Sequence, residues 1–321
     1  MAAFFFLLHS GCALVTSQSD LQIVSFNIKS DPGYPFYDGW NQLDAPRKNR
    51  AIQTLEELEA DLICVQEAQA AQLADLVLGL PGMGVTAESR NPGETDAEWM
   101  GILFNTARLD HLHSGAFWLS RTPEIPGSRF AGSSFPRVVS YALLHDRHTG
   151  GIYGVFCTHL DFEPDVRFLS MQLLREKIFQ IAPFLPLIVL GDFNSRQGDV
   201  AYRMMTDGND LYDSYRRVYP GSRQDDGTLH RSVGDRQGPR VDYIFLSHHF
   251  DTLSAGIYRR TYGEQYPSDH FPIWSRILFD SDQAWLFRSP VDQRPADQLL
   301  HATGAPEFLE QLWYDILRDS F

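Results

Sequence analysis

The sequence has few cysteines, with only Cys12, Cys64 and Cys157 among its 321 residues. Their spacing does not resemble the paired pattern of a structural zinc site, so nothing here indicates zinc. Cys64 and Cys157 each lie in an apolar run typical of a buried strand, where a free thiol packs as a small hydrophobic group. A disulfide between them stays open as an alternative, and it would require export and adjacent strands.

Positive charge is also scarce. The chain has 27 Lys and Arg against 41 Asp and Glu, a formal net charge of -14 and a sequence pI of about 5.1. Tight nucleic-acid binding depends on cations that neutralise phosphates, so this balance disfavours tight binding of duplex DNA. An anionic membrane surface is disfavoured for the same reason. Phosphate chemistry is not excluded, because a metal ion can invert the local field in a small acidic site.

Long hydrophobic runs are missing as well. The apolar stretch MAAFFFLL at residues 1–8 fades by Val15 and is followed by small residues. It is too short to span a bilayer and is typical of the hydrophobic and cleavage regions of a secretory signal, although no Lys or Arg precedes it. We expect residues 1–19 to be a signal peptide of a secreted or periplasmic protein without a transmembrane segment. A frayed N-terminal extension is the alternative.

The most informative stretch is LIVLGDFN at residues 187–194. Its four aliphatic residues predict a fully buried strand, and Gly191 allows a turn. Asp192 and Asn194 are two positions apart, so on an extended segment they point the same way. This pair suits the binding of a water molecule beside a phosphate or a metal. An ordinary turn after a strand is the alternative, because Gly, Asp and Asn are common turn residues.

The apolar patterns predict many strands and a few helices. We expect strands near residues 22–27, 61–65, 99–104, 109–119, 138–144, 152–158, 187–190, 240–246, 257–261 and 271–279, helices near 47–58, 69–78, 165–182 and 200–205, and a loop at 81–97. Strands come in runs and also alternate with helices, which favours mixed sheets packed together with helices outside. We expect one domain at residues 20–280.

The C-terminal extension, residues 281–321, has a different sequence pattern from the domain before it. It contains a polar stretch and an amphipathic helix expected at residues 307–320. This helix either docks on its own domain, which we favour, or binds a partner. Its acidic polar face disfavours membrane insertion.

Polar side chains stand at the ends of several expected strands: Asn27, Glu67, His159, Asp192, Asn194, Asp242, Asp269 and His270. In layered α/β folds, functional sites gather at such ends. Carboxylate and amide oxygens are hard ligands suited to Mg²⁺, Mn²⁺ or Ca²⁺. A single Glu after a strand is usually a surface residue and a single His is usually packed in the core. Their joint occurrence favours a functional site.

Six short motifs together resemble those of a known family: VSFN at 24–27, VQE at 65–67, THLD at 158–161, GDFN at 191–194, RVDYI at 240–244 and SDH at 268–270. In this order they are similar to the motifs of the endonuclease/exonuclease/phosphatase superfamily, which has the deoxyribonuclease I-like fold. The resemblance spans residues 22–279. The segment FWLSRTP at 117–123 also resembles a group of often exported members of the superfamily.

The resemblance implies an α+β fold, a four-layer α/β/β/α sandwich in which two mixed β-sheets pack face to face with helices outside. It also implies cleavage of a P–O bond that depends on Mg²⁺ or Mn²⁺. In this interpretation Glu67 is a metal ligand, and Asn27 and Asp269 complete or support the metal shell. Asp192 positions or deprotonates the attacking water, and Asn194 orients the phosphate or the water.

The histidine roles follow from the same resemblance. His270 contacts the scissile phosphate, and Asp242 accepts a hydrogen bond from its second nitrogen and so holds one tautomer. His159 stabilises the oxygens of the transition state, and we expect it to pair with Glu98. Positioning and electrostatics supply most of the catalysis in such a reaction.

The substrate is the least determined property. The basic residues Arg47, Lys48, Arg50, Arg216, Arg217, Arg223, Arg231 and Arg236 are expected to be a solvated surface with interspersed charges. Arg240 precedes Asp242 by two positions, so we expect it to share the face of Asp242 and reach a phosphate. The aromatic loop Tyr34, Phe36, Tyr37 and Trp40 either stacks on a base or sugar or packs within itself.

We therefore expect a monomeric metal-dependent phosphoesterase whose substrate is a small phosphoester or an oligonucleotide. A nuclease acting on DNA or RNA is one alternative. A catalytically inactive binding module that acts through its C-terminal helix is the other.

Overall fold

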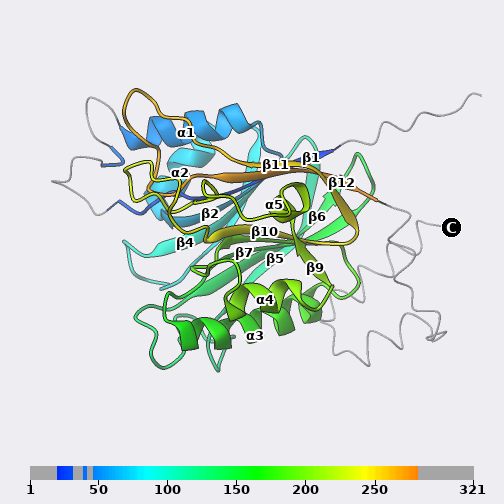
Figure 1. Ribbon diagram of the computed structural model, residues 1–321. Helices are drawn as coiled ribbons and strands as arrows, with labels where there is room; N and C mark the ends of the chain where they lie inside the picture. The colour runs from blue at the N-terminus through cyan, green and yellow to red at the C-terminus, as the bar shows by residue number, and fades with distance from the viewer. Residues whose placement is uncertain (1–19, 32–38, 42–45, 281–321) are drawn as a thin grey trace, which may run out of the picture.

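The computed structural model describes residues 20–31, 39–41 and 46–280. These residues form two six-stranded sheets that pack face to face, with helices on both outer faces (Figure 1). The expected α/β/β/α sandwich is confirmed. The signal peptide expected at 1–19 and the helix expected at 307–320 lie outside the described residues.

The first sheet has the strand order β11-β12-β1-β2-β4-β3. Its strands are β1 (Leu21–Asn27), β2 (Leu62–Gln69), β3 (Met83–Ser89), β4 (Glu98–Asn105), β11 (Phe250–Ile257) and β12 (Ile273–Phe279). Its two central strands, β1 and β2, run parallel with Asn27 opposite Gln66, while β12 and β4 flank them antiparallel. The ends of β1 and β2 therefore meet at one edge of the sheet.

The second sheet has the strand order β5-β6-β7-β8-β10-β9. Its strands are β5 (Leu109–Trp118), β6 (Val138–Asp146), β7 (Ile152–His159), β8 (Leu187–Asp192), β9 (Leu211–Asp213) and β10 (Asp242–Ser247). The parallel pair β7 and β8 sets His159 opposite Asp192, and antiparallel β10 sets Asp242 opposite Asp192 on the other side. Three polar residues thus stand in one row across three strands.

Helices cover the outer faces, as Figure 1 shows, with α1 and α2 above and α3 and α4 below. Their bounds are α1 (Arg47–Leu58), α2 (Ala70–Gly79), α3 (Pro164–Ile181) and α4 (Val200–Thr206), and a fifth short helix, α5 (Ser214–Val218), follows β9. Gln69 and Gln72 form a capping box at the start of α2. Within the described residues, no helix is both long and apolar enough to cross a membrane.

Each interface between layers has its own hydrophobic core. The core between the sheets contains side chains such as Ile23, Ile102 and Leu190. A second core lies under α3 and α4 and a third under α1 and α2. Burial of apolar surface in these cores is the main favourable term in folding, at about 25 cal/mol per Å².

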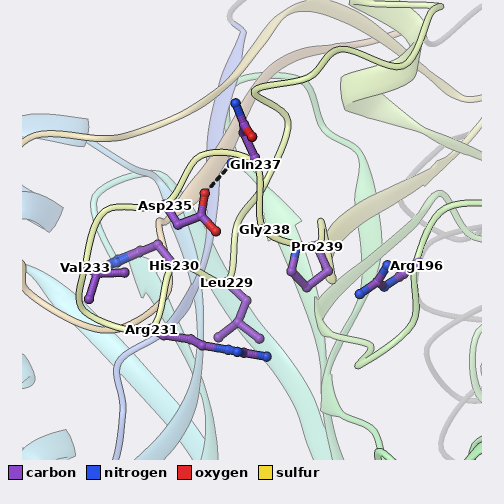
Figure 2. A pocket seen from close by; sticks show the side chains of 9 residues that line it. All are labelled: Arg196, Leu229, His230, Arg231, Val233, Asp235, Gln237, Gly238 and Pro239. Carbon is purple, nitrogen blue, oxygen red and sulfur yellow. Dashed lines mark hydrogen bonds between the residues drawn. The ribbon is translucent and has the colours of Figure 1, made fainter.

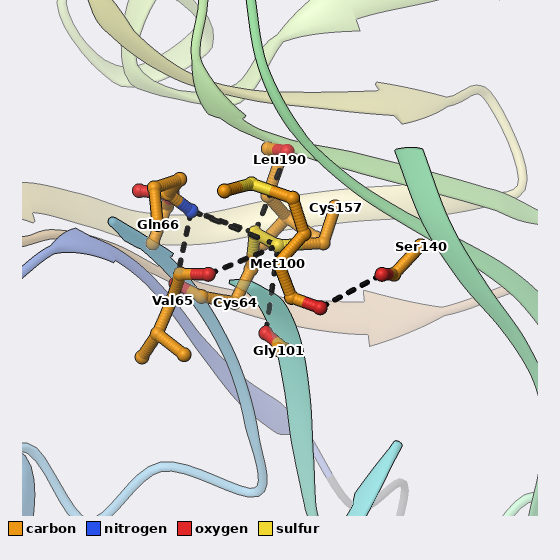
Figure 3. The surroundings of a disulfide bond; sticks show 9 residues. Cys64, Val65, Gln66, Met100, Gly101, Ser140, Cys157 and Leu190 are labelled. Carbon is orange, nitrogen blue, oxygen red and sulfur yellow. Dashed lines mark hydrogen bonds between the residues drawn. A yellow bond between two sulfur atoms is a disulfide. The ribbon is translucent and has the colours of Figure 1, made fainter. Parts of the chain in front are cut away.

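A disulfide joins the two sheets. Cys64 on β2 bonds to Cys157 on β7, with a Cα–Cα distance of 5.6 Å (Figure 3). The expectation that such a bond needs adjacent strands was wrong, because these two strands face each other across the inter-sheet core. Glu67 follows Cys64 by three residues and His159 follows Cys157 by two. The disulfide therefore anchors the two strands that carry polar residues of the expected site.

Some expected elements were wrong in detail. The loop expected at 81–97 contains β3, an edge strand whose side chains are mostly only half-buried and so lack a strong apolar pattern. The strand expected at 257–261 is instead β11, which ends at Ile257. The three-residue strand β9 and the helix α5 were not expected at all.

Candidate active site

The polar ends of the central strands meet at one edge of the sandwich. Two groups of side chains have ligand atoms that all lie within 4.8 Å of one another: Glu67, His159 and Asp192 in one group, and Asp192, Asp242 and His270 in the other. Asp192 belongs to both, so the two groups form one continuous cluster, which we call the catalytic cluster. The sequence predicted all five of its members.

Glu67 has a strained backbone. It lies where the register of β2 against β4 shifts, between Val65 and Ala68, and its φ is +60°, a left-handed value that is rare for a residue with a side chain. Such strain is commonly found at functional sites. The side chain of Glu67 is 23% exposed, so its carboxylate remains open to solvent at the mouth of the cluster.

Asn27 links two acidic side chains. Its Nδ2 donates to Glu67 Oε1 at 2.8 Å and to Asp192 Oδ2 at 3.1 Å, and its Oδ1 accepts from the backbone N–H of Lys29 at 3.0 Å. Glu67 Oε2 also accepts from the backbone N–H of Ser30 at 3.3 Å. Asn27 thus connects the two carboxylates through a single amide group.

Asp192 is buried at the end of β8. Gly191 before it is required, because a Cβ at that position would lie 1.9 Å from the carbonyl oxygen of Thr158. Burial and the neighbouring Asp242 raise the pKa of Asp192 to about 7. Its Oδ1 accepts from the backbone N–H of Asn194 at 2.9 Å. This carboxylate is therefore poised to accept a proton near neutral pH.

His270 and Asp242 form a buried pair. His270 Nδ1 lies 2.9 Å from Asp242 Oδ2, and His270 Nε2 lies 3.8 Å from Asp192 Oδ2. Burial alone would lower the pKa of His270, but Asp242 and then Asp192 raise it to about 10. His270 is therefore a cation at neutral pH, and its Nε2–H faces the centre of the cluster.

His159 is held in the opposite protonation state. Asn194, in a left-handed conformation with φ of +46°, donates from Nδ2 to Leu160 O at 2.9 Å and to His159 Nε2 at 3.0 Å. The proton of His159 therefore sits on Nδ1, which lies 4.0 Å from Glu67 Oε1. Burial, followed by the charges of Arg137 and His270, keeps the pKa of His159 well below its usual value.

Two further expected residues lie near the cluster with other partners. Asp269 adjoins His270 and helps to raise its pKa, but it is not a member of either close group. The expected pairing of Glu98 with His159 was wrong, because Glu98 Oε2 bonds to Arg90 Nη1 at 2.6 Å. Burial and the charge of Glu67 raise the pKa of Glu98 to about 7.

The structure does not leave the two expected substrate residues free. Trp40 is 1% exposed, and its Nε1 donates to Asp75 at 2.9 Å, so its ring packs the core under α1. Arg240 is buried and pairs with Asp213, and its guanidinium lies over the ring of Tyr243. Both expectations have to be corrected. Tyr34, Phe36 and Tyr37 lie outside the described residues.

The sequence reading missed Arg137. This arginine is 4% exposed, and its Nε lies 3.7 Å from Asp161 Oδ2. Its charge lowers the pKa of His159 and interacts with the charge of Asp192, so Arg137 lies close to the catalytic cluster. The available signal was a cation directly before the buried strand β6, where an isolated charge is costly unless it serves a site.

The cluster fits a divalent cation. It contains three carboxylates and two imidazoles, with the amide of Asn27 beside them, and burial together with the charge of Asp242 raises the pKa of Asp192. A cation among these oxygens would relieve that repulsion, and hard oxygen ligands are those preferred by Mg²⁺ and Mn²⁺. Glu67, the most exposed member of the cluster, has the geometry of a ligand that solvent and a cation can reach.

Comparison with known proteins agrees with this geometry. The chain is similar to an endonuclease/exonuclease/phosphatase family protein from Bacteroides thetaiotaomicron, with 28% identity over 82% of this chain and 99% of that one and a TM-score of 0.74. A family member from Bacteroides vulgatus shows 26% identity over 81% and 99%, with a TM-score of 0.74. The mannosyl-6-phosphatase of Bacteroides thetaiotaomicron shows 28% identity over 81% and 100%, with a TM-score of 0.71.

No curated protein sequence is significantly similar to the chain. The model of the endonuclease/exonuclease/phosphatase family matches residues 24–270, a range that contains every member of the catalytic cluster. Members of this family hydrolyse phosphoester bonds. The chain belongs to the endonuclease/exonuclease/phosphatase family.

Proposed function

We propose that the protein is a divalent-metal-dependent phosphoesterase that hydrolyses a P–O bond of a small phosphoester by in-line attack of an activated water. The observation that carries this proposal is the position of Asp192, shared by the two close groups of the catalytic cluster. One group offers a cation-binding carboxylate and the other offers a protonated imidazole. A phosphate between them meets positive charge on both sides.

Glu67 would hold Mg²⁺ or Mn²⁺, with Asp269 and Asn27 completing or supporting the shell. When bound there, the cation supplies Lewis-acid polarisation of a phosphoryl oxygen. Asn27 Nδ2 donates to both Glu67 and Asp192, and these two hydrogen bonds fix the carboxylates relative to each other. The shell would therefore be preorganised before a cation binds.

Asp192 positions the attacking water and takes up its proton. With a pKa raised to about 7, its carboxylate is a stronger base than an ordinary aspartate and is still largely ionised in mildly alkaline solution. Asn194 fixes Asp192 through its backbone N–H and fixes His159 through its side chain. These contacts keep the base and the phosphate-binding groups in one orientation.

Both histidines donate hydrogen bonds to phosphoryl oxygens, one as a cation and the other as a neutral ring. His270 Nε2–H donates as a cation, held by Asp242. His159 Nδ1–H is a neutral donor, and among the described residues it has no hydrogen-bond partner of its own. An unsatisfied buried donor is costly, and a phosphoryl oxygen would remove that cost.

A small substrate is supported by two observations. The chain has a net charge of -14, which opposes a long polyanion. It is also 28% identical to a mannosyl-6-phosphatase along nearly its whole folded part. A phosphorylated sugar is therefore the first substrate class to test.

We also propose that the protein is exported. The Cys64–Cys157 disulfide supports this, because such bonds persist mainly in oxidising compartments. The apolar N-terminal residues support it independently.

A screen of phosphoesters in Mg²⁺, with and without excess chelator, tests the proposed function. The panel contains bis(p-nitrophenyl) phosphate, p-nitrophenyl phosphate, mannose 6-phosphate and a single-stranded oligonucleotide. His270→Ala is the blank, and His148→Ala, an exposed change in the β6–β7 turn, is the matched control. We expect chelator-sensitive hydrolysis of a small ester, lost only in the blank. Cleavage of the oligonucleotide alone would establish a nuclease instead, and no metal-dependent hydrolysis at all would favour an inactive binding module.

A further inference from the structure

A hollow of about 360 Å³ lies beside the catalytic cluster, walled by the loop at residues 228–239 (Figure 2). The loop is tied directly to the cluster. Leu229 forms a β-bridge with His270, and the backbone N–H groups of His230 and Arg231 donate to the carbonyl oxygen of Asp269 at 2.9 and 3.0 Å. A molecule whose phosphate sits at His270 would extend into this hollow.

The wall of the hollow is held in a strained conformation. Arg231 and Ser232 both have left-handed backbones, with φ of +53° and +63°. The turn is closed by Val233 N–H to His230 O at 3.0 Å, and the His230 ring stacks on Phe271 at 4.0 Å. Two consecutive strained residues in a well-bonded turn indicate that the position of these side chains matters for function.

Two arginines face this hollow without a partner. Figure 2 shows the side chains of Arg196 and Arg231 extending from opposite sides toward the same opening. Both are exposed, and within the described part of the chain neither side chain makes an ion pair or a hydrogen bond. By contrast, the exposed Arg147 pairs with Asp110. Two exposed guanidinium groups that face the same hollow can bind one anion together.

A buried histidine supports the wall of the hollow. His230 is fully buried, and its Nδ1 accepts from the backbone N–H of Gly234 at 3.3 Å, so the ring proton sits on Nε2. That Nε2 has no hydrogen-bond partner among the described residues. Because this Nε2 has almost no accessible surface, the His230 ring supports the loop from inside and its Nε2 does not itself contact the hollow.

The remaining lining suits a ring with hydroxyl groups. Leu229 and Val233 provide an apolar surface, and Asp235 and Gln237 lie on the side of the hollow away from Arg231 (Figure 2). A carboxylate is a strong acceptor for hydroxyl groups and repels an anion. The hollow therefore separates a hydroxyl-binding side from an anion-binding side, and its volume admits a group of roughly the size of a sugar.

We propose that this hollow binds the leaving-group part of the substrate, and that this part is a sugar-like ring bearing a second anionic group held by Arg196 and Arg231. The proposal rests on the proposed function, whose phosphate site at His270 it extends. Guanidinium groups bind phosphate and carboxylate with two parallel hydrogen bonds, which explains the choice of arginine at both positions.

The test compares matched ligands with one and two phosphates. The pairs are mannose 6-phosphate with mannose 1,6-bisphosphate, and adenosine 5′-monophosphate with adenosine 3′,5′-bisphosphate. Binding is measured by calorimetry on the full chain in chelator, where turnover is suppressed, and hydrolysis is measured separately in Mg²⁺. The variants are Arg196→Gln, Arg231→Gln and the double change. Arg147→Gln is the control, because it removes the same charge from an exposed arginine at the opposite end of β7.

We expect the sugar bisphosphate to bind at least about tenfold more tightly than the monophosphate, with about tenfold lost for each arginine removed. The preference should weaken with salt and survive in the control. Equal binding of the two sugars, or a preference that persists in the double variant, would overturn the proposal. A preference confined to the nucleotide pair would overturn the sugar assignment. Selective binding without hydrolysis of any ester would retain the subsite and reject the proposed function.

Discussion

Replacing Asp242 by Asn tests how the catalytic cluster keeps a buried histidine charged. The change preserves the shape of the side chain and removes the carboxylate that lies 2.9 Å from His270 Nδ1. Against burial, Asp242 is the main cause that raises the pKa of His270 from 6.5 to about 10. This rise corresponds to roughly 5 kcal/mol of preference for the charged form. Without Asp242, burial offsets the remaining effect of Asp192, and we expect a pKa near the usual 6.5.

The expected loss of activity follows from the protonated fraction. At pH 8, about 99% of His270 is protonated with a pKa of 10, but only about 3% with a pKa of 6.5, so protonation alone costs about thirtyfold in rate. The loss of activity depends on pH in a defined direction. It should grow as pH rises from 6.5 toward 10 and nearly vanish at pH 5.5, where both proteins carry the proton. Removing the charge of Asp242 also lowers the pKa of Asp192, so on the acid side the variant keeps this base ionised to a lower pH than the wild type does.

The assay is hydrolysis of bis(p-nitrophenyl) phosphate from pH 5.5 to 9.5 in Mg²⁺, with Asp251→Asn on the exposed face of β11 as the control. NMR of ¹³C-labelled histidine gives the pKa of His270 without any substrate, and a His270→Gln variant assigns the signal. A rate ratio that does not change with pH would refute the reasoning. So would a wild-type His270 signal that titrates below pH 8.

Three further outcomes are expected. The cysteines of the Cys64–Cys157 disulfide are 93 residues apart, so its reduction should lower the free energy of unfolding by up to about 4.7 kcal/mol through the entropy of the loop that it closes. Urea unfolding with and without reductant measures this loss. Equal stability under both conditions would show that the disulfide does not form. In chelator, the Glu67→Gly variant should be more stable than the Glu67→Ala variant by about 1 kcal/mol, because only Gly adopts a φ of +60° without strain. Thermal melts that give the Ala variant the higher stability would refute this. The folded protein holds His230 neutral down to about pH 4 whereas the unfolded chain protonates it near 6.5, so stability should fall as pH falls through that window. His230→Phe should flatten this dependence in unfolding experiments at pH 4–7, and an identical slope would count against it.

The members of the catalytic cluster were predictable from sequence because each lies at or next to one end of a strand of clear apolar pattern. Asp192 shows this best: four aliphatic residues define its strand, and strand ends in layered folds meet at one edge. The pairing of His270 with Asp242 was implied by the resemblance to the family's motifs, and it agrees with the need of an imidazole for an acceptor on its second nitrogen.

What the sequence could not predict depends on contacts between distant segments. Whether Arg240 is free or paired depends on Asp213, 27 residues away, and the burial of Trp40 depends on α1 and Asp75. The Cys64–Cys157 bond could only be left open as an alternative for a similar reason, because it joins strands from different sheets that local patterns cannot align. Edge strand β3 was missed because its half-buried side chains carry little apolar signal.

The most direct test of the central claim is to locate Mn²⁺ by anomalous diffraction in crystals of the full chain. We predict an anomalous peak at the Glu67 carboxylate, on the side of the catalytic cluster that faces Asp192, and no such peak in Glu67→Ala crystals. A Mn²⁺ peak only elsewhere on the molecule, or one at the cluster that persists in the variant, would contradict the proposed metal-dependent site.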